Sequence, residues 1–380
     1  MLAHLRFPVE QSRGRRYPEP EHSYRNAFQR DRDRIVHSRA FRRLEAKTQV
    51  FTPGMSDHFR TRLTHTIEVA QIARTIAGAL QLNEDLTEAL ALAHDIGHPP
   101  FAHAGEEELN RQMARFGERF DHNLHALRIV EGFEQRFARF PGLNLTFEVR
   151  EGMVKHSRDF EPGEIPELDE YLPGLRPPLE AQLIDLADEV AYNTADLDDA
   201  FSAGMLQAGD VAASVSRYRE IRDAVDEQYP RASERERFHE ILRQLVDSLV
   251  SGVIEGAVQQ ARAAAVMSPA AVRTFPRRLA AFAPEAAAAS RELKAFLHSL
   301  VYSAPALSQA RRRSTAMIAE LFQFFIDYPK RLPEPYCEQA LEAPVHRVVC
   351  DYIAGMTDSF FHRTYEQMIG NARGANPVPA

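Results

Sequence analysis

The chain has 380 residues, of which 44% are hydrophobic and 26% charged, and its formal net charge is −8. This composition argues against a disordered chain, and the two cysteines are too few for a disulfide framework or a four-thiolate metal site. No run reaches the 18 or so apolar residues of a membrane span, and the first residues lack the apolar core of a signal peptide. We therefore expect a cytoplasmic globular protein without a membrane segment.

Charge is unevenly distributed along the chain. Residues 1–50 carry 12 Arg or Lys against 6 Asp or Glu, whereas residues 158–199 carry 2 basic and 13 acidic residues. The basic segment suits phosphate-bearing partners and the acidic one suits a divalent cation, although two solvated surfaces would explain both runs. Charge alone therefore does not choose between these interpretations.

Two consecutive helices are predicted in the first third of the chain. Between residues 64 and 80, Ile67, Ala70, Ala73 and Ala77 recur at helical spacing and predict a buried stripe. A second helix is expected from an N-cap at Asn83 to residue 94. Glycine and a proline pair at residues 97–100 then end it, because proline cannot continue a helix.

Helical patterns continue through the rest of the chain and predict an all-α fold. We expect a helical catalytic core over residues 25–204 and a helical extension over 205–370 that completes the pocket and the oligomer contacts. A basic N-terminal arm (1–24) and a tail (371–380) are expected to be loosely ordered. The further helices are predicted at 123–137, 179–201, 210–227, 231–268, 287–328 and 345–370. Strand signals are weak, and only short runs such as 143–149 could pair.

Histidines are concentrated in one part of the sequence. Eight of the fifteen lie within residues 58–156, and the densest run is HDIGHPPFAHAGE at 94–106. The adjacent His94 and Asp95, at a helix end, can offer an imidazole nitrogen and a carboxylate oxygen to one cation. Such mixed ligands suit a divalent metal such as Mg, Mn, Fe, Co or Ni.

Four separated motifs resemble one family. His65, the pair His94-Asp95 and Asp188 resemble the metal-binding signature of HD-domain phosphohydrolases. More closely, FRRLEAKTQVF (41–51), HDIGHPPFAHAGE (94–106), DLADEVAY (185–192) and DYIAGMTD (351–358) resemble the deoxyguanosine triphosphate triphosphohydrolase family. The resemblance implies metal-dependent hydrolysis of a deoxynucleoside triphosphate to deoxynucleoside and tripolyphosphate. Residues 205–340 contain no motif that can be assigned.

The resemblance also implies the metal ligands. His65 lies early in its helix and His94 and Asp95 at the end of the next, so an antiparallel pair would bring them together. Asp185 and Asp188 share a helical face, and either would reach the site by spacing alone. The family register selects Asp188, and one divalent cation is expected.

Catalytic groups follow from the same correspondence. His103 and Glu106 match a catalytic couple in which the carboxylate, three residues later on one helical face, orients the histidine and raises its basicity. His122 matches a further histidine near the scissile phosphate. The preceding Asp121 stands where the family often has glutamate, so the partner that orients His122 is left open.

Substrate contacts are the last residues implied by the resemblance. Gln49 and Asp196 match a pair that binds the sugar 3′-hydroxyl, and Tyr192 matches a tyrosine stacked on the sugar that excludes a 2′-hydroxyl. Phosphate oxygens would be held by charge-assisted hydrogen bonds from three further residues. These are Arg62, His98 and Lys155.

The family further implies a tetramer or hexamer and, in several members, a second deoxynucleoside triphosphate (dNTP) that acts as an allosteric effector. Two alternatives remain open at this point. One is an HD-type nucleotide or alarmone phosphatase. The other is a regulatory protein that binds nucleotides or single-stranded nucleic acid through its basic arm without catalysis. The base preference and the native metal are not assigned by any motif.

Overall fold

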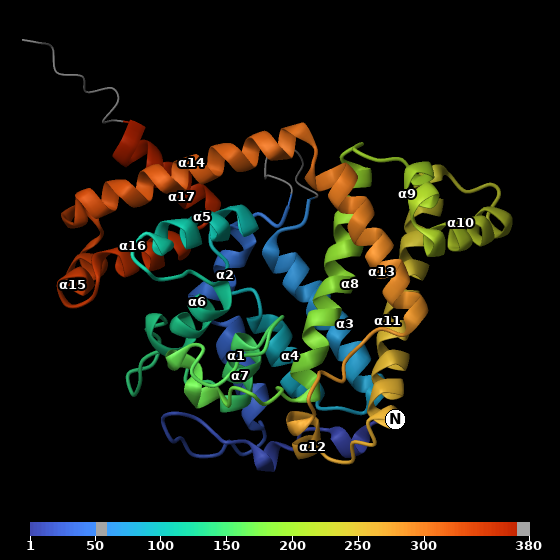
Figure 1. The fold of residues 1–380 in the computed structure, drawn as a ribbon, viewed down its shortest axis with the longest axis horizontal. Coiled ribbons are helices and arrows are strands. Elements are labelled where there is room, and N and C mark those ends of the chain that lie inside the picture. The colour runs from blue at the N-terminus through green and yellow to red at the C-terminus, as the bar shows by residue number, and fades with distance from the viewer. Residues whose placement is uncertain (51–58, 371–380) are drawn as a thin grey trace, which may run out of the picture.

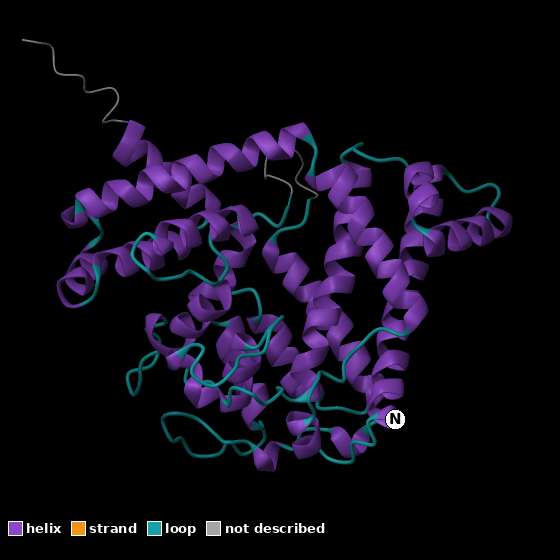
Figure 2. Ribbon diagram, in the orientation of Figure 1, coloured by secondary structure: helices purple, strands orange, loops and turns teal. Residues whose placement is uncertain are grey.

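Helices account for nearly all regular structure in the computed structural model, which describes residues 1–50 and 59–370 (Figures 1 and 2). Within these ranges, extended pairing is limited to isolated bridges such as the one between Arg15 and Thr146. The all-α prediction is confirmed. The α-helices are α1 (Ala27–Val36), α2 (Arg39–Arg43), α3 (Arg62–Leu80), α4 (Glu84–Ala93), α5 (Ala102–Ala114), α6 (His122–Arg128), α7 (Phe147–Val154), α8 (Leu179–Ser202), α9 (Ala208–Ser214), α10 (Ser216–Gln228), α11 (Glu234–Ala263), α12 (Pro269–Thr274), α13 (Pro284–Leu297), α14 (Pro305–Asp327), α15 (Glu334–Glu342), α16 (Val345–Ala354) and α17 (Asp358–Tyr365).

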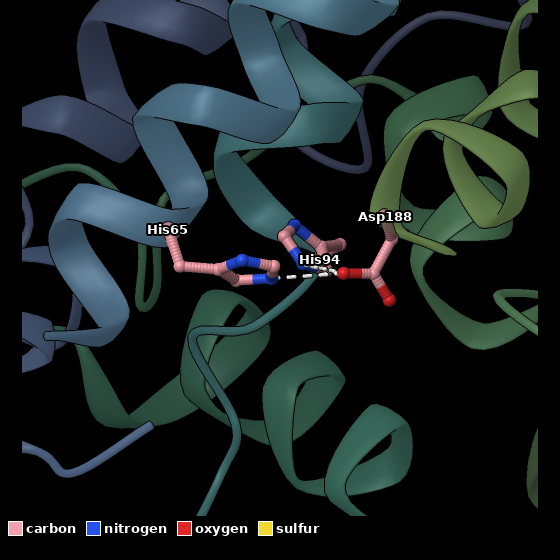
Figure 3. Close-up of side chains that lie close together, drawn as sticks. All are labelled: His65, His94 and Asp188. Atoms are coloured by element: carbon pink, nitrogen blue, oxygen red, sulfur yellow. Dashed lines mark hydrogen bonds and ion pairs between the residues drawn. The ribbon is translucent and has the colours of Figure 1, made fainter. Parts of the chain in front are cut away.

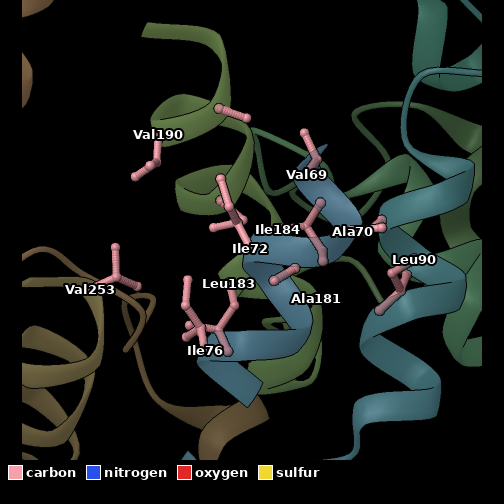
Figure 4. Close-up of a cluster of buried hydrophobic side chains, with 14 of the residues drawn as sticks. Val69, Ala70, Ile72, Ile76, Leu90, Ala181, Leu183, Ile184, Val190 and Val253 are labelled. Atoms are coloured by element: carbon pink, nitrogen blue, oxygen red, sulfur yellow. The ribbon is translucent and has the colours of Figure 1, made fainter. Parts of the chain in front are cut away.

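Helices α3, α4 and α8 form the core that positions the site. The side chain of Asn83 accepts a hydrogen bond from the Leu86 amide, so the predicted N-cap of α4 is confirmed. Ala70, Ala73 and Ala77 of the predicted stripe are buried, and the stripe also includes Val69, Ile72 and Ile76, which face α8 and α11 (Figure 4). Ile67, which the periodicity placed in this stripe, is 52% exposed.

Several predicted helices are interrupted. The 210–227 run divides into α9 and α10, the 231–268 run begins later and ends earlier as α11, and the 287–328 run is broken before Pro305. There a π-helical turn, η6 (His298–Tyr302), joins α13 to α14. The 345–370 run breaks at residues 355–357, where Thr357 caps α17. The last two breaks occur where proline or a capping side chain favours a new start.

The run at 143–149, where pairing was considered, forms no strand. Helix α7 begins at Phe147, and Thr146 forms only an isolated bridge with Arg15. Its amide and hydroxyl both donate to the buried carboxylate of Asp31. A short apolar run cannot by itself distinguish a strand from a buried segment of another kind.

The N-terminal segment is ordered, so the prediction of a loose arm over residues 1–24 is also wrong. Leu2, Leu5 and Phe7 are buried in the core, and the Phe7 amide donates to Glu180 at 2.9 Å. Further along the segment, Ser12 donates to Glu148 at 2.6 Å. Buried apolar side chains and satisfied backbone groups therefore hold this segment. The predicted tail (371–380) lies outside the described residues.

The buried core does not divide at residue 204. Helices α11 and α13 pack against α8, so residues 205–302 share the core of the preceding helices. A second apolar cluster instead joins α5 to α14, α16 and α17, which lie together at one end of the molecule (Figure 1). The extension thus contacts the predicted core on two sides. No described helix is long and apolar enough to cross a membrane.

Candidate active site

Three helices bring a histidine, a second histidine and a carboxylate to one point. His65 lies in the first turn of α3, His94 caps the C-terminus of α4, and Asp188 lies midway along α8. The His65 Nε2 atom is 2.8 Å from Asp188 Oδ1, and the His94 Nε2 atom is 3.8 Å from the same oxygen (Figure 3). One ligand atom from each residue lies within 4.8 Å of the others, so the three could hold a metal ion.

The ring of His94 is fixed in one tautomer. Its Nδ1 atom is 2.6 Å from the carbonyl oxygen of Ala91, which can only accept, so Nδ1 carries the proton and donates. The lone pair of Nε2 then points toward Asp188. This nitrogen is buried without a hydrogen-bond partner among the described residues. A buried, partnerless acceptor facing a carboxylate fits a cation, because metal-bound histidines are oriented in this way.

Burial and the contacts among the three side chains shift the pKa of each of them. Burial opposes the ionised form of Asp188, but its contacts with His65 and His94 hold the pKa of the carboxyl below its ordinary value. Burial lowers the pKa of His94, so its imidazole is kept neutral. For His65, the contact with Asp188 outweighs burial and raises the pKa. A neutral imidazole and an ionised carboxylate are the forms that bind metals.

Asp95 lies at the edge of this group. Its Oδ1 atom is 3.7 Å from His94 Nε2 and 2.9 Å from His98 Nδ1, and its Oδ2 atom accepts from Arg62 at 2.6 Å. Burial raises the pKa of Asp95, but the charge of Arg62 and the contact with His98 outweigh it and hold the pKa well below its ordinary value. Arg62 and His98, both predicted to bind phosphate, therefore lie directly beside the predicted metal ligands.

A second cluster is built around Glu106, in the first turns of α5. Its Oε1 atom is 2.7 Å from His122 Nδ1 and also accepts from the His122 amide, whereas its Oε2 atom is 3.7 Å from His103 Nδ1. The predicted couple therefore has a third member, and Glu106 contacts His122 more closely than His103. Contacts with both imidazoles outweigh burial and hold the pKa of Glu106 well below its ordinary value. Asp121 instead caps α6 by accepting from two backbone amides.

His98 connects the two clusters. Its ring centroid is 3.9 Å from that of His122 and 5.6 Å from that of His103. Burial and the positive charge of Arg62 hold the pKa of His98 well below its ordinary value, so this ring is neutral. His103, by contrast, is 66% exposed and faces the pocket. The exposed imidazole is the one that a substrate can reach.

Gly97 permits this close arrangement. A Cβ atom at this position would lie 2.0 Å from the carbonyl oxygen of His122 and 2.5 Å from the Ala126 amide nitrogen. Only glycine lets the turn after α4 approach the backbone of α6 so closely. The His98 and His122 rings come together for this reason.

A pocket of about 930 Å³ opens beside the second cluster. It is lined by His103, Gln49 and Tyr192, three of the predicted site residues, and by the first half of α14. The Oε1 atom of Gln49 is buried without a hydrogen-bond partner among the described residues. Tyr302, in η6, lies with its ring 5.9 Å from that of Tyr192 and donates to Asp196. Burial raises the pKa of Asp196 to about 7.

Lys155 does not line this pocket. Its ammonium group donates to Glu151 at 2.8 Å and to the carbonyl oxygens of Leu172 and Leu175. The next residue, His156, is closer to the predicted metal ligands, with its ring 5.3 Å from that of His94. Asp185 contacts His156 Nδ1 at 2.7 Å, which raises the pKa of His156 to about 9 against the effect of burial. Asp185 is thereby placed away from the three-residue group.

Sequence patterns did not indicate every residue at the site. His156, Tyr302 and the α14 residues Arg311 and Arg313 lie at the site or line the pocket but belong to no motif described above. The run of three arginines at 311–313 was a compositional signal for an anion-binding surface. Tyr302 had no such signal, because only packing of α13 against α8 brings η6 to the pocket.

Comparisons with known proteins agree with this geometry. Residues 62–193 match the HD domain, and residues 280–367 match the phosphohydrolase-associated domain. A deoxyguanosinetriphosphate triphosphohydrolase-like protein of Geobacter metallireducens is 42% identical over 360 residues, which cover 94% of this chain and 93% of the relative. A protein of the same description from Ruegeria sp. is 43% identical over 375 residues, with 94% and 97% covered. A third, from Bordetella pertussis, is 42% identical over 374 residues, with 97% and 96% covered. The chain therefore belongs to the deoxyguanosinetriphosphate triphosphohydrolase-like family of HD-domain phosphohydrolases.

Proposed function

We propose that this protein is a metal-dependent hydrolase that converts deoxynucleoside triphosphates to deoxynucleosides and tripolyphosphate. The observation that carries the proposal is the buried, partnerless Nε2 atom of His94, which faces Asp188 a short distance from the cluster around Glu106. The names of the relatives support a deoxynucleoside triphosphate as substrate.

His65, His94, Asp95 and Asp188 would hold one divalent cation. When bound, such a cation polarises a phosphate oxygen and lowers the pKa of a coordinated water. The identity of the metal stays open among Mg, Mn, Fe, Co and Ni, all of which accept nitrogen and oxygen ligands.

The remaining groups of the site would neutralise the phosphate charge and donate the proton to the leaving group. Arg62, adjacent to the metal ligands, would offer its guanidinium to phosphate oxygens, together with His98. His103 is exposed to the pocket and would donate a proton to the leaving 5′-oxygen. Glu106 would hold His122 in one orientation by accepting from its Nδ1 atom, and would orient His103 from the same helix.

The pocket supports recognition of a deoxyribose. Gln49 presents an unpaired buried carbonyl oxygen that would accept from the 3′-hydroxyl. Asp196 lies one helical turn after Tyr192, and Tyr192 would pack against the sugar and leave no room for a 2′-hydroxyl. Lys155 would need to leave its present acceptors to reach phosphate, so it is the assignment with the least support.

The alternative of a nucleic-acid-binding regulator has less support. Within the basic N-terminal segment, Arg15, Arg30 and Arg34 form ion pairs with Glu19 or Asp31. Two carboxylates thus partly compensate these three charges, which weakens the field available to a polyanion. A tetrameric or hexameric state, an effector dNTP and a cytoplasmic location stay predictions.

Product analysis tests the proposed function. The purified protein is incubated with each dNTP, singly and in pairs, in the presence of each candidate metal. Tripolyphosphate and deoxynucleoside as the products would support the proposal, whereas orthophosphate would indicate a phosphatase of the alternative class. Turnover of GTP at the rate of dGTP would contradict the role of Tyr192, because a steric clash plus a lost hydrogen bond gives about 100-fold discrimination or more.

A further inference from the structure

The motif DYIAGMTD (351–358) has no role in the site described above, although it lies in the C-terminal part of the chain that packs on α5. Its last residue, Asp358, begins α17 and is buried at 7% exposure. Its carboxylate faces away from solvent and toward two segments that are distant in sequence. These segments are the strand-like stretch at residues 47–49 and the turn that leads into α5.

Each carboxylate oxygen of Asp358 accepts hydrogen bonds from a different segment. Oδ2 accepts from the amide of Thr48 at 2.9 Å and from the Thr48 hydroxyl. Oδ1 accepts from the amide of Phe101 at 3.1 Å. Thr48 is adjacent to Gln49, and Phe101 lies two residues before His103. One carboxylate thus joins the segment that presents Gln49 to the segment that presents His103.

A neighbouring contact joins the same segments. The buried ammonium group of Lys47 donates to the carbonyl oxygen of His98 and to that of Ala354, the latter at 3.3 Å. Residue 354 belongs to the same motif as Asp358. Two motif positions therefore fix the turn at 98–101 relative to residues 47–49.

The backbone at the start of α5 needs such support. Phe101 and Ala102 have φ angles of 63° and 56°, a left-handed conformation that residues other than glycine rarely adopt. Such a conformation persists only where the surrounding structure holds it. The hydrogen bond from the Phe101 amide to Asp358 is one of the contacts that hold it, and the first turn of α5 carries His103.

We propose that Asp358 is a positioning residue of the active site, which sets the separation between Gln49 and His103 by binding both segments through one carboxylate. The inference rests on the proposed function, because it assigns the two segments to sugar binding and proton transfer. A dNTP bound with its sugar at Gln49 would present its 5′-oxygen to His103 only while this separation is kept. Displacing a reacting group by about 1 Å can cost about 100-fold in rate.

The test compares Asp358→Asn with a matched control in the same helix. Asparagine keeps the shape and one acceptor, but its NH₂ group faces either the Thr48 or the Phe101 amide. The control is Thr357→Ala, which removes the N-cap of α17 one residue earlier without contacting either segment. Steady-state kinetics with the preferred dNTP, bound metal and amide hydrogen exchange are measured for both variants and for wild type, at a temperature where circular dichroism shows each folded.

We expect Asp358→Asn to lower kcat/KM by about 10- to 100-fold, with kcat falling and KM rising, while metal content is unchanged. Exchange at the Thr48 and Phe101 amides should be at least about 10-fold faster than in wild type. Thr357→Ala should stay within about threefold of wild type in both parameters and show no faster exchange at these two amides. Wild-type kcat and KM in Asp358→Asn, or an equal loss in Thr357→Ala, would overturn the proposal.

A second variant keeps the test valid if Asp358→Asn does not fold. Thr48→Val removes only the hydroxyl donor on the Gln49 side, so KM should rise several-fold more than kcat falls, with faster exchange at residue 48 and not at residue 101. Equal effects on both parameters would contradict the assignment. If wild type turns over no dNTP, the proposed function fails, and the exchange data still decide whether Asp358 holds the two segments.

Discussion

Gly97→Ala is expected to separate the two histidine clusters. The added Cβ would lie 2.0 Å from the His122 carbonyl oxygen and 2.5 and 2.8 Å from two backbone atoms of Ala126. An ordinary contact of this kind is about 3.4 Å, so the turn after α4 and the backbone of α6 must move apart by roughly 1.4 Å. Overpacking of this kind costs about 1–3 kcal/mol of unfolding free energy, and here backbone rather than a flexible side chain must move.

This movement would displace the His98 and His122 side chains, which the proposed reaction uses. His98 follows Gly97 directly, and its ring lies 3.9 Å from that of His122. We expect dNTP turnover to fall by about 100-fold, more than the loss of folded protein explains. Urea denaturation gives the stability change, and turnover is measured well below the midpoint of unfolding.

Gly78→Ala is the matched control. Gly78 is exposed in α3, and a Cβ there would meet only the Glu84 side chain, at 3.4 Å. This variant should gain about 0.5–1 kcal/mol, because alanine is the better helix former, and turnover should not change. Gly97→Ala with wild-type stability and turnover would refute the close approach of the turn to α6.

Three further outcomes are expected. His94→Ala should lose its bound divalent metal, as measured by elemental analysis. His103→Ala should keep the metal and turn over dNTP about 100-fold more slowly. Equal metal loss in both variants would show that His103 is a ligand. Glu106→Gln should slow dNTP turnover less than His103→Ala does, because the amide oxygen can still accept from His122 Nδ1 although the negative charge is lost. A loss as large as that of His103→Ala would contradict this orienting role. Asp196→Asn should stabilise the protein at pH 8 but not at pH 4, as measured by denaturation at both values. The pKa of Asp196 is raised from 3.8 to about 7. The free energy of unfolding of the wild type is therefore highest below pH 4 and falls by about 4 kcal/mol as the pH rises to 7. A difference in unfolding free energy between the variant and the wild type that does not change with pH would contradict the raised pKa.

Local sequence information predicted the helices α3, α4 and α8 and the residues that meet between them. His65, His94 and Asp188 were indicated by motifs, and spacing placed the first two at facing helix ends. The four motifs also indicated the family. Helix caps and the 3.6-residue period act over a few residues, and they are therefore visible without the fold.

Contacts between distant segments could not be predicted in the same way. Spacing paired Glu106 with His103, three residues away, but the structure brings it closer to His122, sixteen residues away. The arm at residues 1–24 looked unsupported because its partners, such as Glu148 and Glu180, lie far along the chain.

The sequence by itself therefore determined the helical class of this protein, its family and which side chains are the candidates for its chemistry. The tertiary structure decided which of those side chains touch, and it added Tyr302 and Asp358, whose surroundings depend on α13, α14 and α17. The physical reason is the separation in sequence over which each signal acts, because helix periodicity and capping are encoded within a few residues. The close approach at Gly97 and the two-sided contact of Asp358 exist only when whole helices pack.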